Sequence, residues 1–86
     1  MIAEIEDILK KNKGLDKLIC SEDQTHKEMG QILLYEKMKE RGIEEFKSWY
    51  DNEDILDYES ADKKTAIILN CLDEIFYGKV VRLVSP

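Results

Sequence analysis

The chain has 86 residues, of which 43% are hydrophobic and 37% are charged, and its formal net charge is −6. A chain of this length predicts one domain with a small core, so we expect residues 1–86 to form a single helical domain. No apolar run approaches the roughly 20 residues that a transmembrane helix needs, and the acidic N-terminus lacks the basic region of a secretory signal. We therefore expect a cytoplasmic protein that does not enter a membrane.

The first 20 residues predict one helix and one further helical turn. Ile5, Ile8 and Leu9 have helical spacing over a segment from Ile2 to about Lys13, which ends at Gly14. Leu15, Leu18 and Ile19 then have the spacing of one more amphipathic turn.

The second long helix has two candidate starts and one clear end. Capping boxes begin at Ser21 and at Thr25, and a basic turn leads into Gly42. Between these ends, apolar residues from Met29 to Met38 cover most of the helix circumference. Such a helix is central in a bundle or has a partner.

The second half of the chain predicts two helices separated by an acidic stretch. The first runs from Ile43 to about Tyr50, and the second runs from about Ala61 to Tyr77 with Ser60 as its N-cap. The latter is the most apolar element and our candidate for the central core helix. Residues 80–84 leave open a short C-terminal strand or an extended tail. The predicted fold class is all-α or mainly α, a small bundle or array of about four helices.

Several kinds of chemistry lack the residues they require. His26 is the only histidine and lies at a helix cap, which indicates a solvated residue and not a catalytic base. Cys20 and Cys71 are single cysteines among apolar residues, which favours two buried free thiols and leaves their separation open. No metal site, cofactor or enzymatic activity is expected.

Nucleotide, calcium and nucleic-acid binding are also disfavoured. The four glycines occur singly and form no phosphate-binding loop. An EF-hand register starting at Asp51 would place Ile55 and Leu56 where an oxygen ligand and a glycine are required. An acidic chain with two arginines is poorly suited to direct contact with DNA or RNA.

The acidic stretch is the main functional signal. Residues 51–62 contain six acids and no base, and the rest of the chain has thirteen acids against thirteen bases. Aromatic residues, which are common interface hot spots, lie within and just before this stretch. A field of one sign steers a partner of opposite charge. The predicted partner-binding residues are Trp49, Tyr50, Asp51, Glu53, Asp54, Asp57, Tyr58, Glu59 and Asp62.

The leading hypothesis is a small acidic inhibitor or regulator that occupies a basic site on a larger protein. That site is one that otherwise binds nucleic acid, so the carboxylates would mimic phosphates. By analogy of class alone, small acidic proteins of this size include phage-type inhibitors of host defence nucleases and bacteriocin-immunity proteins. The alternative is a homo-oligomeric scaffold or regulatory subunit, a homodimer for example, that associates through the apolar faces of the helix containing Met29 to Met38. A loop whose acids serve only solvation is a third interpretation.

Overall fold

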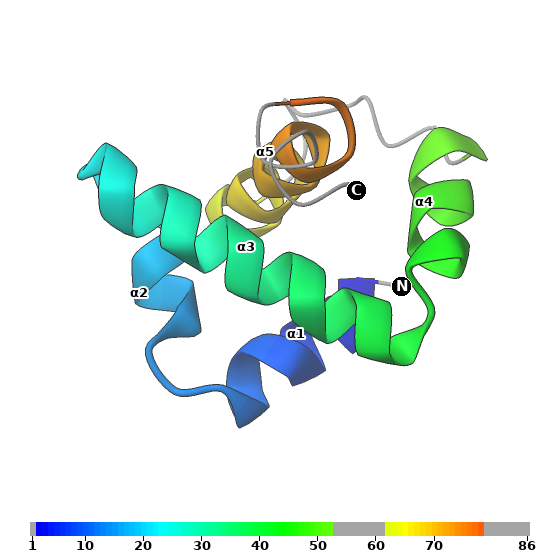
Figure 1. Ribbon diagram of the computed structural model, residues 1–86, viewed down its shortest axis with the longest axis horizontal. Coiled ribbons are helices and arrows are strands. Elements are labelled where there is room, and N and C mark those ends of the chain that lie inside the picture. The colour runs from blue at the N-terminus through cyan, green and yellow to red at the C-terminus, as the bar shows by residue number, and fades with distance from the viewer. Residues whose placement is uncertain (1, 53–61, 79–86) are drawn as a thin grey trace.

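The computed structural model describes residues 2–52 and 62–78, and 85% of these residues are helical. In chain order the helices are α1 (Ile2–Lys11), α2 (Leu15–Ile19), α3 (Gln24–Arg41), α4 (Ile43–Asn52) and α5 (Lys63–Tyr77) (Figure 1). The mainly α fold class is confirmed, and the described ranges contain no strand. The additional helix is α2, which the sequence predicted as a single turn. Residues 80–84, for which a strand was left open, lie outside the described residues.

Helix α3 is the centre of the arrangement. It has 18 residues, contacts each of the other four helices, and crosses the whole molecule in Figure 1. Its buried positions, among them Gly30, Leu34 and Met38, therefore serve different neighbours, as expected for a central helix, whereas Met29 and Leu33 stay exposed. Helix α5 was expected to be central and does supply the largest set of buried residues, six in all. The helix-to-helix contacts nevertheless converge on α3.

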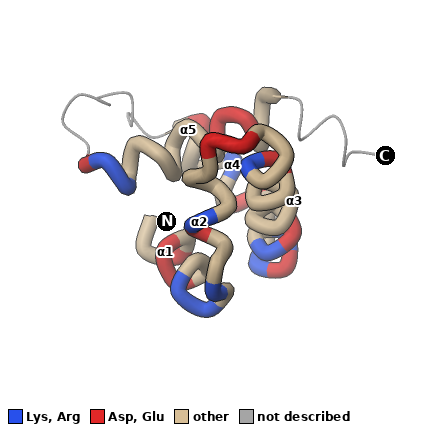
Figure 2. The backbone as a smooth tube through the Cα atoms, turned by 90° about the vertical axis from the view of Figure 1, so that its left-hand side faces the viewer, with Lys and Arg blue, Asp and Glu red and all other residues tan. Residues whose placement is uncertain are grey.

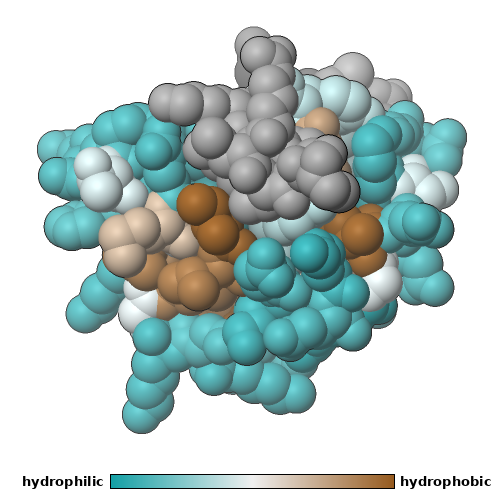
Figure 3. Space-filling view, in the orientation of Figure 1, coloured by the Kyte–Doolittle hydropathy of each residue, from teal (hydrophilic) through white to brown (hydrophobic). Residues whose placement is uncertain are grey.

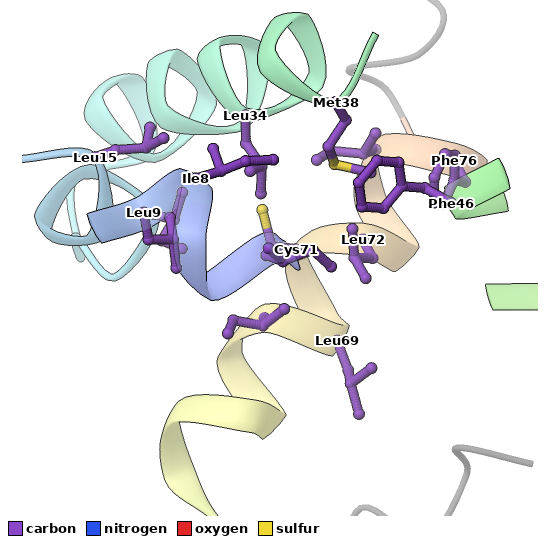
Figure 4. Packing of buried hydrophobic residues seen from close by; sticks show 14 residues of the cluster. Ile8, Leu9, Leu15, Leu34, Met38, Phe46, Leu69, Cys71, Leu72 and Phe76 are labelled. Atoms are coloured by element: carbon purple, nitrogen blue, oxygen red, sulfur yellow. The ribbon is translucent and has the colours of Figure 1, made fainter. Parts of the chain in front are cut away.

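The core contains residues from all five helices. Figure 4 shows Ile8 of α1, Leu34 of α3 and Cys71 of α5 pointing toward one another, with Met38 facing Phe46 of α4. Each of these five side chains is at most 3% exposed. Full burial of a large apolar side chain stabilises a fold by about 1.5–3 kcal/mol, so this shared core is the main force that holds the helices together.

The N-termini of α3 and α5 differ from the sequence predictions. Helix α3 is capped by Asp23, which lies between the two expected sites, and the Asp23 side chain accepts a hydrogen bond from the His26 N–H at 3.0 Å. Helix α5 is capped by Asp62 instead of Ser60, and Asp62 accepts from the Thr65 N–H at 2.7 Å. A carboxylate caps as well as a hydroxyl and also interacts favourably with the positive end of the helix dipole. Both capping predictions were therefore wrong in position.

Close packing between α2 and α3 depends on Gly30. A Cβ at this position would lie 2.7 Å from the Leu18 Cβ and 2.8 Å from the Ile19 backbone nitrogen. Such contacts are too short for any side chain, so only glycine allows α2 to lie this near α3. Helices α2 and α3 are consequently packed closely against each other at Gly30.

Candidate partner-binding surface

Helix α4 carries three of the predicted partner-binding residues, namely Trp49, Tyr50 and Asp51. Phe46, Trp49 and Tyr50 share one face because they are spaced three and four residues apart. Phe46 is buried, and Trp49 and Tyr50 are half-buried against the core. Asp51 follows on the exposed side of the helix. Trp49 and Tyr50 thus anchor α4 on the core and also keep part of their surface accessible.

Tyr50 ties α4 to α5. Its hydroxyl donates a hydrogen bond to Asp73 Oδ1 at 2.9 Å. Its ring lies 5.7 Å from the Phe76 ring and 6.1 Å from the Tyr77 ring, in tilted arrangements that favour aromatic contact. Tyr50 therefore has a structural role in addition to any contact with a partner.

Asp51 is paired within the chain. Lys47 Nζ donates to Asp51 Oδ2 at 2.7 Å, and the Tyr77 hydroxyl donates to the other carboxylate oxygen. Lys47 also donates to the Tyr77 hydroxyl at 3.1 Å and lies 4.9 Å from the centre of the Tyr77 ring. The hydrogen bond from Lys47 lowers the pKa of Asp51, and the same bond raises the pKa of Lys47. The charge of Asp51 is thereby balanced locally.

Asp62 also has a structural function. It is the N-cap of α5, and the hydrogen bond from the Thr65 backbone N–H lowers the pKa of its carboxyl group. The carboxylate stays exposed, so its charge still contributes to the surface. The remaining predicted residues, Glu53, Asp54, Asp57, Tyr58 and Glu59, lie outside the described residues.

The sequence analysis missed three residues of this cluster, namely Lys47, Asp73 and Tyr77. Lys47 precedes Asp51 by four residues, which is the spacing of an ion pair on one helix face, so this contact was available from the sequence. Asp73 and Tyr77 reach α4 from 23 and 26 residues away along the chain. Only the packing of α5 against α4 brings them there.

The two cysteines have different environments. Cys71 is buried, which raises the pKa of its thiol to about 12. Cys20 is exposed, so the expectation that both thiols are buried was wrong for Cys20. Its position directly after the short helix α2 places it at the surface. Both residues line one small cavity of about 160 Å³ between α2 and α5, and both are free thiols.

A larger groove lies where the α1–α2 connection and α2 meet α3. It has a volume of about 460 Å³ and is lined by three leucines and three lysines, Leu15, Leu18, Leu33, Lys11, Lys13 and Lys37. Leu33 is 45% exposed and Met29, one turn earlier on α3, is 50% exposed. Figure 3 shows apolar side chains gathered over the middle of α3. The exposed apolar residues of α3, Met29 and Leu33, are a surface feature that the sequence analysis had interpreted only as helix packing or as a site of self-association.

The described residues hold no group of three or more His, Cys, Asp or Glu side chains that would bind a metal ion. None of the helices in the same residues is both long and apolar enough to cross a membrane. His26 is exposed, and its ring Nδ1 is 3.8 Å from the Asp23 carboxylate.

Comparison of the chain with protein-family models, with curated proteins and with solved structures finds no match in any of the three.

Proposed function

We propose that this chain is a small acidic protein that binds a larger protein and inhibits or regulates it by occupying a basic site. On this proposal the chain acts by binding and not as an enzyme. The basic site is one that otherwise holds the phosphates of a nucleic acid, with the carboxylates of residues 51–62 taking the place of those phosphates.

One observation carries the proposal. The whole net charge of −6 lies in residues 51–62, because the acids and bases of the other 74 residues are equal in number. This stretch directly follows Trp49 and Tyr50, whose rings are partly accessible at the end of α4. Partly accessible aromatic rings beside a field of one sign provide the hot-spot and steering contributions that protein interfaces use.

Two of the six acids have contacts within the chain, so they are poor choices for a test of the proposal. Asp51 is balanced by Lys47, and Asp62 caps α5. A variant that changes either carboxylate would disturb an intramolecular contact as well as the surface charge. Glu53, Asp54, Asp57 and Glu59 are the residues to change, and Asp51 and Asp62 are best left intact.

The experiment compares two variants with the same change in net charge. In the test variant Glu53, Asp54, Asp57 and Glu59 become Gln or Asn, and in the control variant four exposed glutamates become Gln. The control residues are Glu22, Glu36, Glu40 and Glu44. Each protein is used to capture partners from a lysate of the source organism at about 50 mM and about 300 mM salt.

We expect wild type and control to retain a basic-surfaced protein at the lower salt concentration only, and the test variant to lose it. The purified partner should then lose nucleic-acid binding when wild type is added. Equal capture by the test and control variants would contradict the proposal.

A second candidate function rests on the exposed apolar residues of α3. If Met29 and Leu33 pack against a second copy, the chain is a homo-oligomeric scaffold or regulatory subunit. Leu34 and Met38 are fully buried, so they belong to the core and cannot form such an interface. This candidate predicts a dimer in sedimentation experiments that Leu33→Asp converts to a folded monomer. A wild-type monomer at high protein concentration would exclude it.

A further inference from the structure

We propose that the groove between α2 and α3 is a docking site for an acidic amphipathic helix of a partner protein. The groove is lined by Leu15, Leu18, Leu33, Lys11, Lys13 and Lys37, and it shares no residue with the acidic surface described above. The groove would thus be a second binding surface, with a charge opposite to that of the proposed acidic surface.

The apolar part of the groove is suited to a helix. Three leucines line it: Leu15 is buried, Leu18 is half-buried, and Leu33 is 45% exposed. Because Gly30 brings α2 close to α3, the groove runs between two packed helices, where a third helix can insert side chains spaced three and four residues apart.

The charges around the groove identify the occupant as acidic. Three lysines line it and no carboxylate does, although the whole chain is acidic. Figure 2 shows the lysines of the α1–α2 connection gathered at one end of the molecule. Residues 11–13 and residue 37 are far apart in sequence, so the fold itself assembles this basic rim.

Ordinary helix electrostatics explains only part of the rim. Lys11 lies in the last turn of α1, where a cation interacts with the helix dipole. Lys13 follows the helix end, and Lys37 lies before the last turn of α3, whose basic residues are Lys39 and Arg41. Lys13 and Lys37 thus lie just outside the last turns of their helices, where the interaction with the helix dipole is weaker.

The lysines are also weakly engaged within the described residues. Lys13 has no ion pair there, and Lys37 lies 3.8 Å from Glu40 in an exposed contact. Lys11 lies 3.1 Å from Asp7, but Asp7 is held more closely by Arg41 at 2.8 Å. Exposed pairs of this kind contribute little, so carboxylates of a partner can replace them at small cost.

The same charges argue against other occupants. A symmetric dimer through this groove would bring the lysines of one copy against those of the other. A net charge of −6 repels an anionic membrane, and a concave surface does not suit a bilayer. An acidic helix with leucine-like anchors satisfies both the apolar and the basic parts of the groove.

The test is a display library of helical peptides in which every charged position encodes Glu and Lys equally, selected against the full chain. We expect enrichment of acidic peptides with apolar residues three and four positions apart. The double variant Lys13→Glu/Lys37→Glu should weaken the best peptide by about tenfold or more at low salt, and Leu33→Asp should abolish its binding. The control Lys63→Glu/Lys64→Glu changes the net charge equally and should alter affinity less than about twofold. Circular dichroism verifies that each variant is folded.

Several results would overturn the inference. These are enrichment of basic or neutral peptides, no enrichment, or binding that survives the Lys13→Glu/Lys37→Glu change. Self-association abolished by Leu33→Asp would assign the groove to a second copy, and binding to phosphatidylserine vesicles lost in the same variants would assign it to a membrane. The peptide selection can fail or succeed independently of the proposed function. The variant that neutralises the acids of residues 53–59 leaves all groove residues unchanged, so the two proposals are tested by different substitutions.

Discussion

Gln31 of α3 donates its side-chain amide to the Glu74 carboxylate of α5 across 2.6 Å, and Gln31 is fully buried. Glu74 is partly exposed and also lies 3.7 Å from Lys27 Nζ. The amide oxygen of Gln31 has no partner among the described residues. Within the described ranges, the core thus contains one buried polar side chain, and it depends on a single partner at the surface.

This dependence predicts an asymmetric response to mutation. Glu74→Ala should destabilise the protein by about 1–3 kcal/mol, because it leaves the buried Gln31 amide without an acceptor. Gln31→Met, which removes the buried polar group and keeps a similar volume, should change stability by less than about 1 kcal/mol. In the double variant the penalty of Glu74→Ala should largely disappear. Urea denaturation measures the free energy of unfolding of all three variants. If Glu74→Ala destabilises the protein equally whether residue 31 is Gln or Met, Glu74 is not the partner on which the buried Gln31 amide depends.

Gly30→Ala should destabilise the protein even though alanine favours a helix by about 1 kcal/mol over glycine. The added Cβ would meet the Ile19 backbone nitrogen at 2.8 Å, so α2 has to move away from α3. We expect a net loss of about 1–3 kcal/mol in thermal or chemical unfolding. An increase in stability would show that α2 does not pack on α3 as described.

Stability should fall in acid because two helix caps are carboxylates. Backbone hydrogen bonds, from His26 to Asp23 and from Thr65 to Asp62, lower the pKa of each carboxyl group below its ordinary value of 3.8. Folding therefore favours the deprotonated form, so the stabilisation is present above the ordinary pKa and is lost as the pH falls through the lower folded-state pKa.

The double variant Asp23→Asn/Asp62→Asn checks this cause. Asparagine retains the capping hydrogen bond but does not titrate in this range. Melting temperatures measured from neutral pH to about pH 2 should fall less steeply in the variant than in wild type. Parallel curves would mean that other groups cause the acid dependence.

The two thiols should react at very different rates. Cys20 is exposed, and Cys71 is buried with its thiol pKa raised to about 12. Since the thiolate is the reactive form, a thiol reagent at about pH 8 should modify one cysteine per chain rapidly and the second only as the protein unfolds. Cys20→Ser should remove the rapid phase. A rapid phase that survives this substitution would contradict the burial of Cys71.

Periodicity of apolar residues was sufficient to predict the class of the fold and the extent of most helices. It located Ile5, Ile8 and Leu9 on the buried face of α1, and a basic turn followed by glycine located the end of α3 at Gly42. It could not choose among neighbouring capping residues, because Ser, Thr and Asp all accept the same hydrogen bond. It also could not separate Leu33 from Leu34, which are adjacent but 45% and 0% exposed. That difference is set by where α2 and α5 lie around α3.

The candidate site was less predictable. The charge imbalance of residues 51–62 is a property of the sequence alone, and so is the Lys47–Asp51 spacing. The contacts of Tyr50 with Asp73 and of Tyr77 with Asp51 require α5 to pack beside α4. The basic rim of the groove likewise joins residues 11–13 to residue 37, which no local pattern relates.

The most direct test of the acidic-surface proposal is hydrogen exchange of the chain, free and bound to the partner captured at low salt. We predict that binding slows exchange most strongly between residues 49 and 62, and that raising the salt from about 50 mM to about 300 mM removes this protection. Protection confined to α2 and α3 and unchanged by salt would contradict the proposal, because the contact would then be apolar and would not involve residues 49–62.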